Sequence, residues 1–193
     1  MFLEEVWQGM GPYLLRKGDT LSLGRLVLRA AIGGLFIGHG TQKLFGWFGG
    51  GGLEKTGEGF AAIGLVPGRR NALVAGLAES GGGALLALGL ATPLAETALI
   101  SVMLTAIRTV HWKNGPWATN GGYEYNLVLV SALLGLAEAG PGCFSFDHVL
   151  GIERSGLPWM AAAAALGAAG SLAATAASAA QPTGEDAAEP AGA

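Results

Sequence analysis

The chain has 193 residues, of which 51% are hydrophobic and only 13% are charged. Its mean hydropathy of +0.45 is typical of a membrane protein and excludes a water-soluble globule. The net charge of −3 and the lack of a basic run argue against a nucleic-acid partner. A single cysteine, Cys143, excludes an intrachain disulfide, a CxxC redox pair, a thiolate zinc cage and covalently attached haem.

An N-terminal extension, residues 1–22, precedes the first long apolar segment. Its apolar residues have helical spacing interrupted by Gly11 and Pro12, which indicates either a weak interfacial helix or an unstructured start. Arg16, Lys17 and Arg25 flank the first apolar segment. Because positive flanks tend to stay inside, we expect a retained signal anchor with its N-terminus in the cytoplasm.

Four apolar segments are long enough to cross a hydrocarbon core. They cover residues 26–45, 71–90, 94–110 and 123–139. The sequence therefore predicts an all-α membrane protein built as an antiparallel four-helix transmembrane bundle, with its domain at 23–147.

The C-terminal part of the chain contains an alanine-rich segment followed by a polar tail. An alanine-rich segment at 157–179 is a candidate fifth transmembrane helix within the region 148–180, but alanine adds little insertion energy. Residues 181–193 have the composition of a disordered acidic tail.

Polar residues inside the predicted spans indicate a functional site. His39 and Glu79 lie at matching depth, about 10 to 12 Å from the ends of neighbouring antiparallel segments, at a rise of about 1.5 Å per residue. We expect a hydrogen bond between them, because a buried carboxylate and imidazole must be paired, neutral or hydrated. The structural alternative is that this pair only locks two helices together.

More polar side chains are predicted near the same membrane face, where they would form a funnel. These are Lys43, Arg108, His111, Asn114, Asn120 and Glu124. Each has a structural alternative, such as a lysine reaching the headgroups or an acidic residue at a helix start.

Other polar residues are assigned structural roles. Thr92 is a predicted N-cap followed by Pro93, so Glu96 near that helix start is left out of the site. His148 is expected in a solvated loop and Cys143 as a buried bystander. Small residues at Gly34 and Gly38, and at Gly83 with Ala87, predict close helix contacts.

Alternation of the spans places two loops, 46–70 and 112–122, on one face. These loops and their flanks carry aromatic residues that are typical of a membrane-interface belt. Their glycines permit tight turns, which are compatible with a lid over a ligand and slightly favour a simple connector. The glycines at 49–52 resemble a phosphate-binding loop only faintly, because Glu54 stands before Lys55 where that motif has glycine.

Several of these motifs together resemble the DoxX family of bacterial membrane proteins, over about residues 23–147. The resemblance rests on the string from His39 to Gly52, on Glu79 with the glycines that follow it, on His111, Asn114 and Gly115, and on the run from Gly121 to Tyr125. It implies a four-helix bundle in the bacterial inner membrane and an oxidoreductase role beside soluble redox or sulfur-handling partners. After Gly115 this chain has Pro116 and Trp117, where relatives commonly have phenylalanines.

Combining the residues with the resemblance, we expect a quinone-linked oxidoreductase subunit. The expected catalytic residues are His39, Glu79 and His111, and the expected substrate-binding residues are Gln42, Lys43, Arg108, Asn114, Glu124 and Tyr125. We expect no metal site and no covalently bound cofactor, with a quinone as substrate. The expected partners are the lipid bilayer, a soluble redox or sulfur-handling enzyme and a second copy of the chain.

Two other functions remain open at this point. One is a non-enzymatic scaffold or maturation factor for redox proteins, which would use the glycine and aromatic face. The other is a proton or small-solute carrier, which would use the polar funnel.

Overall fold

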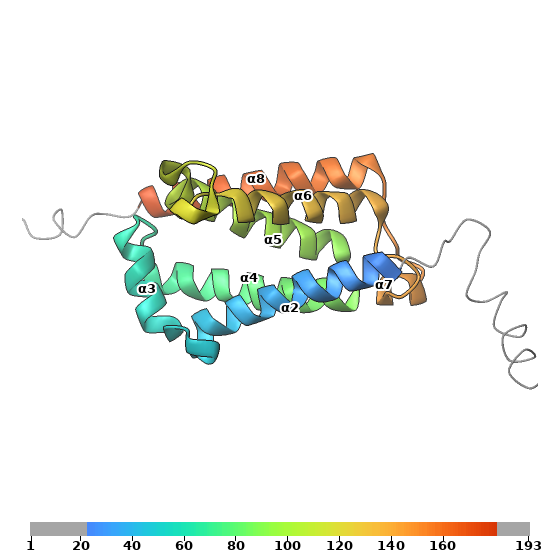
Figure 1. Ribbon diagram of the computed structural model, residues 1–193, viewed down its shortest axis with the longest axis horizontal. Coiled ribbons are helices and arrows are strands. Elements are labelled where there is room, and N and C mark those ends of the chain that lie inside the picture. The colour runs from blue at the N-terminus through green and yellow to red at the C-terminus, as the bar shows by residue number, and fades with distance from the viewer. Residues whose placement is uncertain (1–22, 181–193) are drawn as a thin grey trace, which may run out of the picture.

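The computed structural model describes residues 23–180, and within that part of the chain it contains helices and turns but no strand (Figure 1). The α-helices are α2 (Leu23–Phe45), α3 (Gly52–Ala62), α4 (Gly68–Leu88), α5 (Thr92–Ala106), α6 (Glu124–Ala139), α7 (Phe146–Val149) and α8 (Leu157–Ala179). Shorter turns are η1 (Trp47–Gly49), the π-helical η2 (Ile107–His111), η3 (Trp112–Asn114) and η4 (Ala118–Asn120). The predicted interfacial helix before residue 23 and the predicted tail after residue 180 lie outside the described residues.

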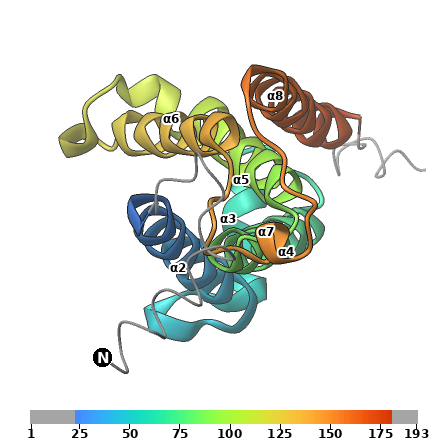
Figure 2. The ribbon, with the colours of Figure 1, turned by 90° about the vertical axis from the view of Figure 1, so that its right-hand side faces the viewer.

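Five long helices run alongside one another, with α5 in the middle. Figure 2, an end-on view, shows α5 between α4 on one side and α6 with α8 on the other, and α2 packs against α4. The core between them is built from side chains that are almost fully enclosed, such as Phe36, Leu86, Leu99, Ile100 and Leu133. The predicted all-α architecture is confirmed, and the bundle contains the alanine-rich helix as well as the four segments expected first.

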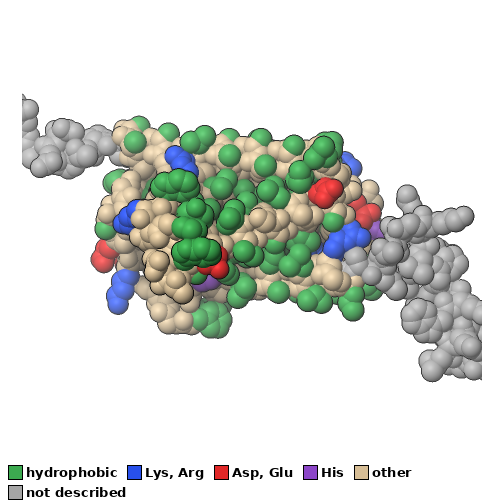
Figure 3. Space-filling model, turned by 45° about the horizontal axis from the view of Figure 1, so that its top comes forward, with side chains coloured by type: hydrophobic (Ala, Val, Ile, Leu, Met, Phe, Trp, Pro, Cys, Tyr) green, Lys and Arg blue, Asp and Glu red, His purple; other side chains and the backbone are tan. Residues whose placement is uncertain are grey.

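Three helical stretches are long and apolar enough to cross a membrane by length and composition. They are Gly68–Leu88, Thr92–Asn114 and Leu157–Ala179. Helix α2, which carries Arg25, Arg29 and Lys43, and α6, which has 16 residues, are not among them, although the sequence predicted both as spans. On the face seen in Figure 3, hydrophobic side chains cover the middle and charged ones gather toward the two ends.

Helix α8 extends along the whole bundle. At its start, the Gly156 N–H donates 2.7 Å to the carbonyl of Glu138 at the end of α6. At its end, Asn71 Nδ2 of α4 donates 3.2 Å to Ser178 Oγ. The alanine-rich segment, predicted as a candidate fifth transmembrane helix, therefore packs along the bundle beside α4 and α6, and it is long and apolar enough to cross a membrane.

Helices α2 and α4 approach closely through glycines. A Cβ at Gly33 would lie 2.5 Å from the Gly83 carbonyl oxygen, and a Cβ at Gly40 would lie 2.6 Å from the Gly76 carbonyl oxygen. By contrast, a Cβ at Gly34 or Gly38 would meet nothing within 4 Å. The predicted pair Gly34 and Gly38 was therefore wrong, because both lie outside this contact, whereas Gly83 with Ala87 was correct.

The segment between α2 and α4 is also more ordered than a glycine-rich connector. It forms η1 and then α3, which lies across the end of the bundle (Figure 1). Gly57 explains the close packing of α3 on α4, because a Cβ there would lie 2.9 Å from Arg69 Cα. The glycines that suggested a flexible loop thus include one that a helix contact requires.

Candidate functional site

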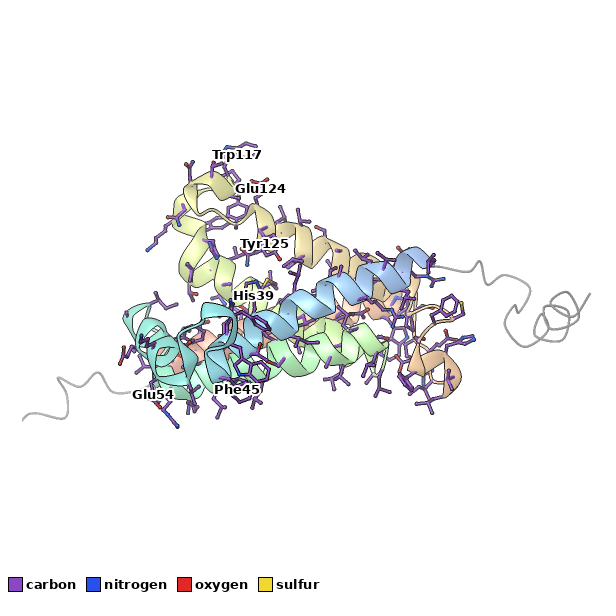
Figure 4. All side chains as sticks on the ribbon, turned by 60° about the horizontal axis from the view of Figure 1, so that its bottom comes forward. His39, Phe45, Glu54, Trp117, Glu124 and Tyr125 are labelled. Atoms are coloured by element: carbon purple, nitrogen blue, oxygen red, sulfur yellow. The ribbon has the colours of Figure 1, made fainter. Side chains whose placement is uncertain are left out.

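A cavity of about 590 Å³ lies inside the bundle near the α3 end. Its wall is mostly apolar and is contributed by α2, α3, α4, α5, α6 and α8, together with η2. Five of the predicted site residues line it: His39, Lys43, Glu79, His111 and Tyr125. Figure 4 shows His39 on α2 and Tyr125 on α6 on facing sides of the space between these helices. The structure thus gathers both histidines and an ion pair around one apolar chamber.

The ion pair joins α2 to α4. Lys43 Nζ donates to Glu79 Oε2 at 2.5 Å, and the Glu79 side chain is only 3% exposed, whereas that of Lys43 is 22% exposed. Gly40 and Gly76 each lie three residues before a member of the pair, and their close contact brings the two backbones together there. A buried carboxylate needs such a partner, since an isolated charge away from water is very costly.

His39 does not bind Glu79, and the expected hydrogen bond between them was wrong. Its ring atom Nδ1 lies 3.1 Å from Gln42 Oε1 on the same helix, and the residue is exposed. His39 and Glu79 nevertheless line the same cavity. However, Lys43 is one helical turn further along α2 and has the longer side chain, so it takes the carboxylate.

His111 is placed by an irregular stretch at the end of α5. This helix passes into the π-helical η2 and then into η3, so His111 stands where the helix register changes. Its Nδ1 lies 2.7 Å from the Gly121 carbonyl oxygen, to which Asn114 Nδ2 also donates at 3.1 Å. π-helical segments are rare and frequently mark functional sites.

Four predicted site residues lie outside the cavity wall and hold the framework around it. Gln42 Nε2 donates 3.3 Å to the Phe48 carbonyl, and Glu124 Oε2 accepts 2.9 Å from the Ala118 N–H. Asn114 binds Gly121 as described, and Arg108 Nη1 donates 3.3 Å to Ser171 Oγ of α8. These contacts stabilise the loops or link two helices, and none of the four side chains lines the cavity.

Sequence reasoning missed Asn126, a buried amide in the cavity wall on α6. Its Nδ2 lies 3.3 Å from Met103 Sδ, a weak acceptor for an amide donor. The sequence did carry a signal, because Asn126 is a polar residue in an apolar segment. We selected its neighbours Glu124 and Tyr125 instead.

A second group of buried charges lies at the opposite end of the bundle. Arg29 and Asp147 are almost fully enclosed, and Arg29 Nη2 donates 2.5 Å to the Phe144 carbonyl. The carboxylate of Asp147 accepts from the N–H groups of Ala91 and Thr92, at 2.7 and 2.9 Å, and from Thr92 Oγ1 at 2.8 Å. Asp147 therefore caps α5 from 55 residues away.

This arrangement corrects the prediction that Thr92 is the N-cap of that helix. Thr92 is the first helical residue, and Ala91 before it has a left-handed φ of 47°. The buried Glu96 lies within electrostatic range of Arg29 and Asp147, in agreement with its exclusion from the candidate site.

Two further residues at this end differ from expectation. His148, expected in a solvated loop, is half-buried in α7 with Nδ1 3.0 Å from Glu153 Oε1. Cys143 is a free, half-buried thiol.

Within residues 23–180, no three His, Cys, Asp or Glu residues gather in a way that could hold a metal ion.

Comparison with known proteins agrees with the resemblance noted from the motifs. A family model described as DoxX matches residues 24–112. A Bacillus subtilis (strain 168) protein named "Putative oxidoreductase CatD" is 33% identical over 117 residues, which cover 61% of this chain and 81% of that protein. No solved structure is significantly similar to the chain.

Proposed function

Because the chain belongs to the DoxX family and is a multi-pass membrane protein, we propose that it is the quinone-binding membrane subunit of an oxidoreductase. The proposal places α2, α4, α5, α6 and α8 across the bacterial inner membrane, with the start of α2 toward the cytoplasm. The related protein's name supports redox chemistry, and the cavity supports the kind of substrate.

The observation that carries this proposal is the mixed character of the cavity. A volume of about 590 Å³ lies within the range of small-molecule sites, and apolar side chains form most of the wall. A quinone matches this wall through its ring and isoprenoid tail, while its two oxygens need polar partners. Lys43, His39 and His111 line the same cavity and offer partners for these oxygens, the lysine as a donor to a carbonyl and the histidines as partners of the hydroxyl groups of the reduced form.

Reduction of a quinone to a quinol consumes two electrons and two protons. In the proposal, a soluble redox or sulfur-handling enzyme exchanges the electrons with the bound ligand, and the polar side chains of the cavity exchange the protons. His39 lines the cavity, and an imidazole is suited to proton transfer near neutral pH. Lys43 and Glu79 form an ion pair in the wall of the same cavity.

The test is quinone binding by the purified protein and by matched variants. His39→Ala and Glu79→Gln remove groups that line the cavity, whereas His148→Ala and Glu54→Gln change the same residue types at ion pairs outside it. We expect saturable binding of decylubiquinol, weakened about tenfold or more by the first two changes and unaffected by the controls. Equal binding by all five proteins would reject the site.

A scaffold function is the second candidate, and one observation favours it. Large aromatic side chains are exposed at the cavity end of the molecule, including Phe48 at 76%, Trp112 at 66% and Trp117 at 64%. They suit a membrane interface, and they also suit a docking surface for a soluble protein. Capture of a redox enzyme that is lost in Trp117→Ala but retained in His39→Ala would support the scaffold.

A further inference from the structure

The hydrogen bonds of the two cavity histidines define which of their ring nitrogens carries the proton. At His111, Nδ1 lies 2.7 Å from the Gly121 carbonyl oxygen, which can only accept. Nδ1 must therefore be the donor. In the neutral ring, Nε2 is then a lone-pair acceptor.

The same assignment follows for His39, with Gln42 as the intermediate. Gln42 Nε2 donates 3.3 Å to the Phe48 carbonyl, which sets the orientation of the amide and directs Oε1 to His39. The reversed amide would set two carbonyl oxygens against each other. His39 Nδ1 is therefore also the donor, and its Nε2 is also an acceptor.

Both histidines line one cavity, and an Nε2 atom that faces it meets a ligand as an acceptor. Lys43 is the neighbouring donor, and its ammonium donates to Glu79 Oε2 at 2.5 Å and to the His39 carbonyl at 3.5 Å, which leaves one N–H for a ligand beside the two Nε2 acceptors. A quinone presents two carbonyl oxygens, which accept and cannot use an Nε2 lone pair. A quinol presents two hydroxyl groups, which donate.

We propose that this site binds the quinol form in preference to the quinone, through hydroxyl donation to Nε2 of His39 and His111. The proposal rests on the quinone-binding function above and specifies which form of the ligand the site recognises. Gln42 and Gly121 are then positioning residues, because they act through the histidines they orient.

The experiment compares three ligands with the same ring and tail. Decylubiquinol, decylubiquinone and decylubiquinol dimethyl ether are titrated anaerobically into the full-length protein in detergent, and affinities are measured by calorimetry. The ether keeps the shape of the quinol but cannot donate. With two neutral hydrogen bonds at stake, we expect the quinol to bind about tenfold more tightly than either of the others.

Two variants test the role of the ring nitrogens. His111→Gln places a rotatable amide near the position of Nε2, and this amide can donate to a carbonyl as well as accept from a hydroxyl. Gln42→Leu removes the partner that orients His39. We expect both to reduce the preference for quinol over quinone to about threefold or less, whereas His148→Gln keeps the full preference.

Each outcome has a distinct meaning. Equal affinity for all three ligands, with binding still weakened by His39→Ala, would overturn the quinol preference and leave quinone binding intact. Tighter binding of the quinone than of the quinol would do the same. Failure of every ligand to bind would overturn both this inference and the proposed function.

Discussion

At the end of the bundle opposite the cavity, which we call the closed end, Arg29 and Asp147 direct their charges mainly at backbone groups. At the cavity end, Lys43 and Glu79 line the chamber. Both pairs belong to a membrane protein, and both include a side chain that is almost fully buried. At the closed end, the Asp147 carboxylate accepts hydrogen bonds from the backbone N–H groups at the start of α5. The cavity end places its charges where a ligand can reach them. Burial of a charge alone therefore does not distinguish a structural role from a functional one.

The largest expected effect is at the closed end. Asp147→Asn replaces an acceptor of three hydrogen bonds by an amide whose NH2 faces donors, so we expect a loss of about 3 kcal/mol in unfolding free energy. Denaturant unfolding in detergent measures it, with exposed Glu138→Gln as the control. If Asp147→Asn lost quinone affinity while keeping its stability, the structural assignment of this end would fail.

The ion pair at the cavity end should show strong coupling between its members. Lys43→Met leaves the carboxylate of Glu79 buried without its partner, at a cost of about 2 to 4 kcal/mol. Because Lys43→Met with Glu79→Gln removes both charges, we expect the double variant to recover at least about 1 kcal/mol relative to additivity. Strict additivity in the double-mutant cycle would show that the two groups do not interact.

The glycine contact between α2 and α4 gives a smaller effect with an internal control. Gly33→Val introduces atoms against the Gly83 backbone and should cost about 1 to 3 kcal/mol. Gly34→Val is its neighbour in sequence, but its new side chain points into open space. Similar unfolding curves for the two variants would contradict the assigned helix contact.

The smallest expected effect is at Arg108. Its guanidinium binds Ser171 of α8 and does not line the cavity. Arg108→Ala should therefore change ligand affinity less than about twofold and unfolding free energy by less than about 1 kcal/mol. A tenfold loss of affinity would return Arg108 to the site.

Hydropathy located the long helices, because a bilayer demands about twenty apolar residues per span. However, only three stretches are long and apolar enough to cross a membrane, and α2 and α6, which were also predicted as spans, are not among them. The segment predicted at 157–179 coincides with α8. Helix α3 was missed because its glycines suggest a turn when neighbouring elements are unknown. The prediction named Gly34 and Gly38 as the contact residues of α2, but the structure uses Gly33 and Gly40. The sequence could not separate these pairs, because the face that a helix turns to its neighbour depends on that neighbour.

The candidate site was predictable in composition but not in connectivity. Depth along the helices brought His39, Glu79 and His111 to one region, and all three line the cavity. Depth could not distinguish His39 from Lys43 as the partner of Glu79, because that choice depends on side-chain length and direction. Asp147 could not be assigned at all, since its role as a helix cap requires a contact between residues 55 positions apart.

Photoaffinity labelling with an azidoquinone tests most directly whether the cavity is the ligand site. We predict labels on the α2 peptide that carries His39 and on the peptide covering residues 101–111, both suppressed by excess decylubiquinone. Labels confined to the outward face of α8, where Leu166 and Leu172 are exposed, and not suppressed by the competitor would contradict it.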